Sequence, residues 1–161
     1  MRYTIATLVE DKPGVMTRMA GLFSRRGFNI ESLTVGKTDK IGRSRFTIVV
    51  EGDERILNQV TKQLQRLVNV IKVKHIENSE SIQREYALVK IKDQIEKRAE
   101  ILNLVEIFKG KILDASDETL VVEATGNEKD IDTAFRLLEA YNIIESIRTG
   151  KISLERGKQL I

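Results

Sequence analysis

Hydrophobic positions in the first half of the chain recur at two different spacings. Alternating apolar and β-branched residues predict strands, and apolar residues three or four positions apart predict helices. The predicted strands are 4–9, 28–36, 45–51 and 70–76. The predicted helices are 15–26, which Gly27 ends, and 56–67. The first half therefore reads strand, helix, strand, strand, helix, strand.

The second half repeats the same order after a polar stretch at 78–81. Its predicted strands are 86–92, 111–115, 119–125 and 143–150, and its predicted helices are 95–108 and 131–141. We therefore predict an α+β protein with two ferredoxin-like βαββαβ domains in tandem. The expected boundaries are 1–77 for the first domain, 78–83 for a linker and 84–161 for the second domain. Each domain is small, so an edge strand would gain from pairing with a second copy.

The amino-acid composition removes several kinds of chemistry. The 161 residues include one His and no Cys, which excludes disulfides, thiolate zinc sites and a Cys–His catalytic pair. Lys and Arg number 27 against 24 Asp and Glu, with the signs interspersed, as on a solvated surface. No apolar run approaches the roughly 20 residues of a membrane span, and the first residues show no signal-peptide pattern. We expect a cytoplasmic protein that binds neither nucleic acid nor membrane.

One connection carries a candidate binding site. Residues Glu10–Met16 join the first strand to the first helix and include Gly14 and the only proline, Pro13. Proline suits the first turn of a helix, and glycine lets a ligand approach the backbone closely. The N–H groups and the dipole of a helix N-terminus favour a carboxylate, and Asp11 can receive an ammonium group or cap the helix. These residues fit either an amino-acid site or a simple capped turn.

The wider sequence around this loop distinguishes between the two interpretations. Asp11–Met16 within a βαββαβ frame resembles the ACT domain, a small regulatory module that binds amino acids. The longer stretch Gly21–Gly36 resembles the signature of the small, regulatory subunit of acetolactate synthase, also called acetohydroxyacid synthase. Further similar stretches are 44–48, 63–68, 84–91 and 107–112. The resemblance extends to Gly157 and so covers essentially the whole chain.

The resemblance implies a regulatory subunit without an active site or a cofactor of its own. Its implied partner is the large catalytic subunit, which carries thiamine diphosphate, a divalent metal (Mg) and FAD, and condenses two pyruvates to 2-acetolactate. The small subunit is expected to raise that activity and to confer feedback inhibition by valine in branched-chain amino-acid synthesis. The resemblance also implies a homodimer formed through the ACT domains.

The same resemblance assigns the effector site to the interface between two ACT domains. The expected effector-binding residues are Asp11, Gly14, Val15 and Met16 from one chain, and Asn29 and Ile30 from the other. Their chemistry suits an amino acid, because backbone N–H groups can hold a carboxylate and an amide both donates and accepts. The apolar side chains can enclose an isopropyl group or pack in the core. Relatives often have Asn at the position of Asp11, whose carboxylate would attract an ammonium group.

Other interpretations have weaker support. A ferredoxin-like sheet is also the frame of RNA-binding RRM modules, but residues 45–50 have one aromatic side chain and no glycine. A stand-alone amino-acid sensor is the main alternative. His75 is expected to be an edge residue, and the acidic residues Asp114, Asp117 and Glu118 a solvated turn, since calcium needs about six oxygens. The second half has no Pro-Gly loop at 93–96, so we expect it to serve assembly or activation.

Overall fold

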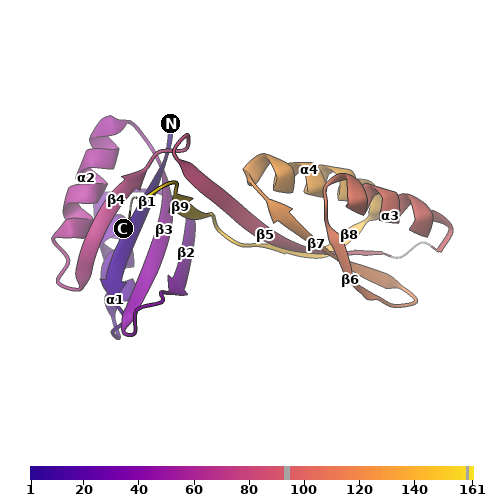
Figure 1. Cartoon of the computed structure of the whole chain (residues 1–161), viewed down its shortest axis with the longest axis horizontal. Helices are drawn as coiled ribbons and strands as arrows, with labels where there is room; N and C mark the ends of the chain where they lie inside the picture. The colour runs from indigo at the N-terminus through magenta and orange to yellow at the C-terminus, as the bar shows by residue number, and fades with distance from the viewer. Residues whose placement is uncertain (93–94, 159) are drawn as a thin grey trace. The chain divides into compact units, whose positions relative to one another are not determined.

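The structure is a computed structural model, and it describes residues 1–92, 95–158 and 160–161. The chain forms two units. The first comprises Met1–Gln83 together with Gly150–Ile161, and the second comprises Arg84–Thr149. Strands and helices follow the order β-α-β-β-α-β twice along the chain, which confirms the predicted α+β fold class (Figure 1).

The first unit has an antiparallel sheet with two helices on one face (Figure 1). Its elements are β1 (Arg2–Glu10), α1 (Val15–Arg26), β2 (Ile30–Lys37), β3 (Arg43–Glu51), α2 (Glu54–Gln65) and β4 (Val70–Ile76). The strand order is β2-β3-β1-β4, so β2 and β4 form the edges of this sheet. Because β3 pairs antiparallel with both β1 and β2, these two strands run parallel to each other.

Alternation along the strands places one set of side chains against the helices. Ile5 of β1 and Ile48 of β3 are paired and almost completely buried in this layer. Helix α1 adds buried residues at helical spacing, which are Val15, Met19, Leu22 and Phe23. The helix ends at Gly27, whose left-handed φ of 65° lets its N–H donate to the last turn. The core therefore fixes α1 on the sheet, and with it the loop at the N-terminus of this helix.

The second unit repeats this arrangement with the strand order β6-β7-β5-β8. Its elements are β5 (Ser81–Lys92), whose residues 81–83 group with the first unit, α3 (Arg98–Ile107), β6 (Lys111–Ala115), β7 (Thr119–Gly126), α4 (Glu128–Leu138) and β8 (Ile143–Arg148). Single 3-10 turns at Ile95–Lys97 and Glu139–Tyr141 extend α3 and α4, which explains why one helix is predicted to begin at 95 and the other to end at 141. The prediction for 93–96 includes Asp93 and Gln94, which lie outside the described residues.

Two expected boundaries differ from the structure. Strand β5 begins at Ser81, inside the linker predicted over 78–83. Residues 150–161, expected in the second domain over 84–161, group with the first unit. They contain β9 (Ile152–Glu155), which pairs with β5 and which the sequence pattern does not indicate. Four residues are too few to show a period, and the contacts that hold β9 come from residues distant in the sequence.

We predict that Thr7→Val stabilises the first unit. The Thr7 side chain is fully buried, and its Oγ1 has no hydrogen-bond partner among the described residues. A buried hydroxyl without a partner costs about 1–3 kcal/mol, and valine has nearly the same shape, so the free energy of unfolding should rise by about 1 kcal/mol. Chemical denaturation measures this, with Thr125→Val at an exposed strand position as the control. A lower stability for Thr7→Val would show that the hydroxyl is satisfied in solution.

Candidate functional site

The loop between β1 and α1 bends at Gly14. This residue has φ 81° and ψ −3°, in the left-handed region that glycine adopts without strain. The N–H of Asp11 donates to the carbonyl oxygen of Gly42 at 2.8 Å, and the N–H of Val15 donates to that of Lys12 at 3.3 Å. Residues 11–14 are exposed, so the anchored loop presents its backbone to solvent at the start of the helix.

The N-terminus of α1 carries no negative charge of its own. Its first turn contains no acidic residue, and no side chain caps it. Asp11 therefore does not cap the helix, because Gly14 occupies the N-cap position; this corrects one of the two roles expected for Asp11. The N–H groups of Met16 and Thr17 have no hydrogen-bond partner among the described residues. The positive end of the helix dipole is thus open to an anion.

A polar cluster that the sequence pattern does not reveal lies beside this loop. Nη1 of Arg18 lies 3.1 Å from the position that a Cβ on Gly14 would occupy. Helical side chains lean toward the N-terminus, so the four-residue spacing between these positions is the signal that could have revealed the contact. Nη2 of Arg18 donates to Oδ1 of Asn69, and Nδ2 of Asn69 donates to Oε2 of Glu10 at 2.8 Å. The cluster places a guanidinium group close to the uncapped helix end.

Glu10 is the anion of this cluster. Its Oε2 lies 2.9 Å from Nζ of Lys12. Hydrogen bonds from Lys12 and Asn69, together with the charge of Lys12, lower the pKa of Glu10 below its ordinary value. The carboxylate of Glu10 is therefore already paired with Lys12 and Asn69. The first turn of α1 has no acidic residue and no side-chain cap, so no carboxylate of the helix itself balances its positive end.

The apolar residues expected at the site differ in exposure. Val15 is 5% exposed and belongs to the core of the first unit, whereas Met16 is 43% exposed. Val15 therefore packs in the core, which leaves the Met16 side chain on the surface beside the loop.

The other two expected residues lie where β2 begins. Asn29 is exposed and follows Gly27, which ends α1. Ile30 is half-buried and opens β2 opposite Val50 of β3. A register shift between Ile30 and Ser32 forms a bulge immediately after this point.

The six expected residues do not all meet within one chain. In the pairing register, Ile30 of β2 lies level with Val50 of β3 and Tyr3 of β1. Asp11 follows Tyr3 by eight residues along β1. At about 3.3 Å per residue, the two groups lie about 25 Å apart along the sheet. The structure brings Asp11, Gly14, Val15 and Met16 together but leaves Asn29 and Ile30 at the opposite end.

The remaining candidates from the sequence have structural explanations. Nδ1 of His75 on β4 lies 3.2 Å from Oε1 of Glu77, and its ring packs edge-on against Tyr3. Among the residues that the structure describes, no group of three or more potential metal ligands occurs, including at the acidic β6–β7 hairpin. In the described part of the chain, no helix combines the length and the apolar character needed to cross a membrane.

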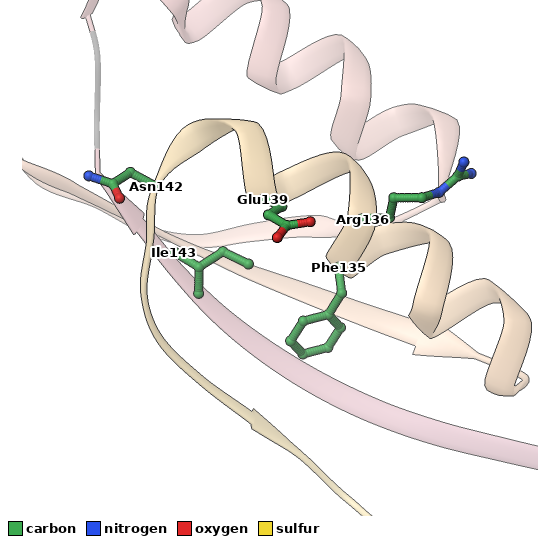
Figure 2. A pocket seen from close by; sticks show the side chains of 5 residues that line it. All are labelled: Phe135, Arg136, Glu139, Asn142 and Ile143. Atoms are coloured by element: carbon green, nitrogen blue, oxygen red, sulfur yellow. The ribbon is translucent and has the colours of Figure 1, made fainter.

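A hollow in the second unit lies between α4 and the start of β8 (Figure 2). Its lining residues are Phe135, Arg136, Glu139, Asn142 and Ile143. Two of them, Phe135 and Ile143, also pack against the core of the second unit. The hollow contains none of the six expected residues, and it does not extend the candidate site.

Two family models match the chain, one in each half. The model described as "AHAS small subunit-like ACT domain" matches residues 5–72. The model described as "Small subunit of acetolactate synthase" matches residues 84–157. The fold, the loop and these matches define a regulatory protein built on an ACT domain.

Individual relatives are similar to this chain along almost its whole length. A "Probable acetolactate synthase small subunit" of Archaeoglobus fulgidus is 49% identical over 159 residues, covering 99% of each chain. An "Acetolactate synthase small subunit" of Mycobacterium bovis is 47% identical over 155 residues, covering 96% of this chain and 92% of the relative. The crystal structure of the small subunit from Thermotoga maritima has a TM-score of 0.93 at 40% identity, with 99% of each chain covered. The chain belongs to the family of acetolactate synthase small subunits, the regulatory subunits, and catalysis belongs to the large subunit.

We predict that Lys12→Met raises the pKa of Glu10. Lys12 is the main cause of the lowered value, so removing its ammonium group brings the pKa back toward the ordinary one. A carboxylate with a depressed folded pKa stabilises the fold above its unfolded pKa, and this contribution is lost as the pH falls through the folded value. An NMR titration of the Glu10 carboxyl measures the change, with Lys37→Met as the control. If Lys12→Met leaves the Glu10 pKa where it was, the Lys12–Glu10 pairing does not persist in solution.

Proposed function

We propose that this chain activates the large catalytic subunit of acetolactate synthase and makes that subunit sensitive to valine. The observation that supports effector binding is the uncapped N-terminus of α1, free of acidic residues, at an exposed glycine loop in a chain of this family. In this proposal the pyruvate chemistry, with thiamine diphosphate, Mg and FAD, takes place on the large subunit. The small subunit contributes binding energy that shifts the activity of the assembly.

Valine has three recognisable groups, and the candidate site offers a counterpart for each. The carboxylate fits the N–H groups of Met16 and Thr17 at the positive end of α1, beside Gly14. The ammonium group fits the carboxylate of Asp11. The isopropyl group fits the exposed Met16 side chain and Ile30 of a second copy, beside which Asn29 offers an amide for the polar end.

A second copy is needed because the two halves of this site lie at opposite ends of one sheet. Strand β2 is an edge, and its Leu33 and Val35 side chains are 37% and 42% exposed. An edge strand with exposed apolar side chains favours pairing with another strand. Antiparallel pairing of two β2 strands about a twofold axis turns one copy end for end. The start of β2 in one chain then lies near the loop of its partner.

Reconstitution with the cognate large subunit tests the proposed function. Acetolactate formation is measured for the large subunit alone, with this chain, and with this chain plus valine. We expect the chain to raise the rate and valine to lower it again. No activation would refute the regulatory role, and activation without a valine response would refute effector sensing alone.

We predict that Gly14→Asp weakens inhibition by valine. The new carboxylate would lie near the Arg18 guanidinium and the helix N-terminus, where the valine carboxylate is expected to bind. The valine concentration for half-inhibition should rise at least about tenfold, within the usual range of coupling between sites. Gly157→Asp is the matched control, because Gly157 also has a left-handed φ, +73°, and open space around it. Equal inhibition of Gly14→Asp and wild type would place the effector elsewhere.

We predict that Val35→Lys weakens the dimer and removes the valine response together. The substitution puts an ammonium group on the exposed edge strand, where two copies would bring like charges close across the axis. Sedimentation velocity and the reconstituted assay measure the two effects. Ile71→Lys is the control, because Ile71 is 45% exposed on β4, at the opposite edge of the same sheet. A variant that is dimeric and fully inhibited by valine would contradict pairing through β2.

A further inference from the structure

Residues 150–158, which we name the C-terminal strap, group with the first unit. Contacts with β2, β3 and β4 place the strap on the face of the sheet that α1 and α2 leave open. The N–H of Lys151 in the strap donates to Oγ of Ser32 on β2 at 3.1 Å. On β3, Nη2 of Arg45 donates to the carbonyl oxygen of Ser153 at 2.6 Å. The strap is drawn in yellow beside the strands of the first unit in Figure 1.

The far end of the strap is held by an ion pair. Oε2 of Glu155 lies 2.6 Å from Nζ of Lys74 on β4, and the Glu155 side chain is only 7% exposed. Side chains on this face are buried although they point away from the helices; they include Thr4, Ala6, Thr47, Val49 and Ile76, each at most 4% exposed. The strap is therefore a seated part of the first unit rather than a loose tail.

Gly150 is the tightest point of this contact. A Cβ at Gly150 would lie 2.4 Å from Oγ1 of Thr34 and 2.5 Å from Oγ of Ser32. It would also lie 3.1 Å from the backbone carbon of Leu33. Carbon and oxygen atoms do not approach this closely without displacement, so a larger residue at 150 must either turn the Ser32 and Thr34 hydroxyl groups away or shift the strap from β2. Turning the Ser32 hydroxyl away breaks its bond to the N–H of Lys151. Gly36, further along β2, has open space where its Cβ would be.

The seated strap leaves two buried hydroxyl groups unsatisfied. Oγ1 of Thr34 and Oγ of Ser153 have no hydrogen-bond partner among the described residues. Burying a hydroxyl without a partner is unfavourable, and release of the strap would let water reach both groups. The strap is thus held by its pairing with β5 and by specific side-chain bonds against an opposing cost. Its contact with β2 depends on Gly150 and on the bond between Lys151 and Ser32.

We infer that the C-terminal strap positions β2, and that its bond to Ser32 sets the placement of Asn29 and Ile30 at the start of that strand. Ser32 lies directly after the bulge that follows Ile30, so a shift at Ser32 is transmitted over two residues. Within one chain, β2 has only one neighbouring strand, β3, and the strap is its other support. In the proposed dimer the second copy pairs with the outer edge of β2, whereas the strap contacts its open face. The role of the strap on β2 stands on these contacts alone, and its effect on the effector rests on the proposed valine site.

The test compares Gly150→Ala with its matched control Gly36→Ala in the full-length chain. Amide hydrogen exchange across β2 reports whether the strand is held, and the reconstituted holoenzyme reports the valine concentration for half-inhibition. We expect Gly150→Ala to speed exchange at residues 30–37 and to raise the half-inhibiting valine concentration at least about fivefold, with activation retained. Gly36→Ala should match the wild type in both. Ser32→Ala, which removes the acceptor without adding bulk, should move both readouts in the same direction and serves if Gly150→Ala folds poorly.

The outcomes separate the two claims. Exchange in β2 that is the same in Gly150→Ala, Ser32→Ala and the wild type would overturn the strap as a support of β2. Faster exchange with an unchanged valine response would overturn the link to Asn29 and Ile30 while the proposed function stands. If the wild-type holoenzyme does not respond to valine, the proposed effector site is refuted and the exchange measurement alone decides the role of the strap.

Discussion

The antiparallel pairing of β3 with both β1 and β2 determines what a single chain can bind. Because these neighbours run parallel to each other, the loop after β1 lies at the opposite end of the sheet from the start of β2. The separation of about 25 Å along the strands is several times the length of an amino acid. A site that uses Gly14 and Asn29 together therefore needs two chains, and a twofold axis would create two such sites. A ligand that binds only the dimer also stabilises it, which couples effector binding to assembly.

Strand β2 is where the proposed interactions of this chain converge. Its outer edge faces the proposed second copy, its first residue belongs to the proposed effector site, and Ser32 accepts a hydrogen bond from the C-terminal strap. Within a single chain, β2 has one sheet neighbour and is therefore among the more easily displaced parts of the sheet, so its position depends on the strap and on the proposed second copy. Valine can change the activity of the assembly only by binding one arrangement more tightly than another. Alternative positions of β2, with the strap docked or released, would supply such a pair of arrangements.

Elements with a clear hydrophobic period can be predicted from the sequence, whereas contacts between residues distant along the chain cannot. The strand predicted over 70–76 coincides with β4, and both βαββαβ orders are confirmed. The capping role of Asp11 is wrong because a glycine in the left-handed region takes the N-cap position, which side-chain chemistry alone does not reveal. The bond between Arg18 and Asn69 joins residues 51 positions apart, and β9 is held by Lys74 and Arg45, which are 81 and 108 positions from their partners in β9. The register of β1, β2 and β3 places the two halves of the site at opposite ends of the sheet. This register follows from strand pairing rather than from local composition.

Mixed dimers test the shared site most directly. One chain carries Gly14→Asp, which damages the loop, and the other carries Asn29→Ala, which damages the start of β2; two different tags allow the mixed species to be purified. A shared site gives this dimer one site with both halves damaged and one with both halves intact. Titration calorimetry should then find about one valine per mixed dimer, about half the wild-type number, and none for either variant alone. A mixed dimer that binds no valine, while the wild-type dimer binds it, would contradict a site divided between two chains.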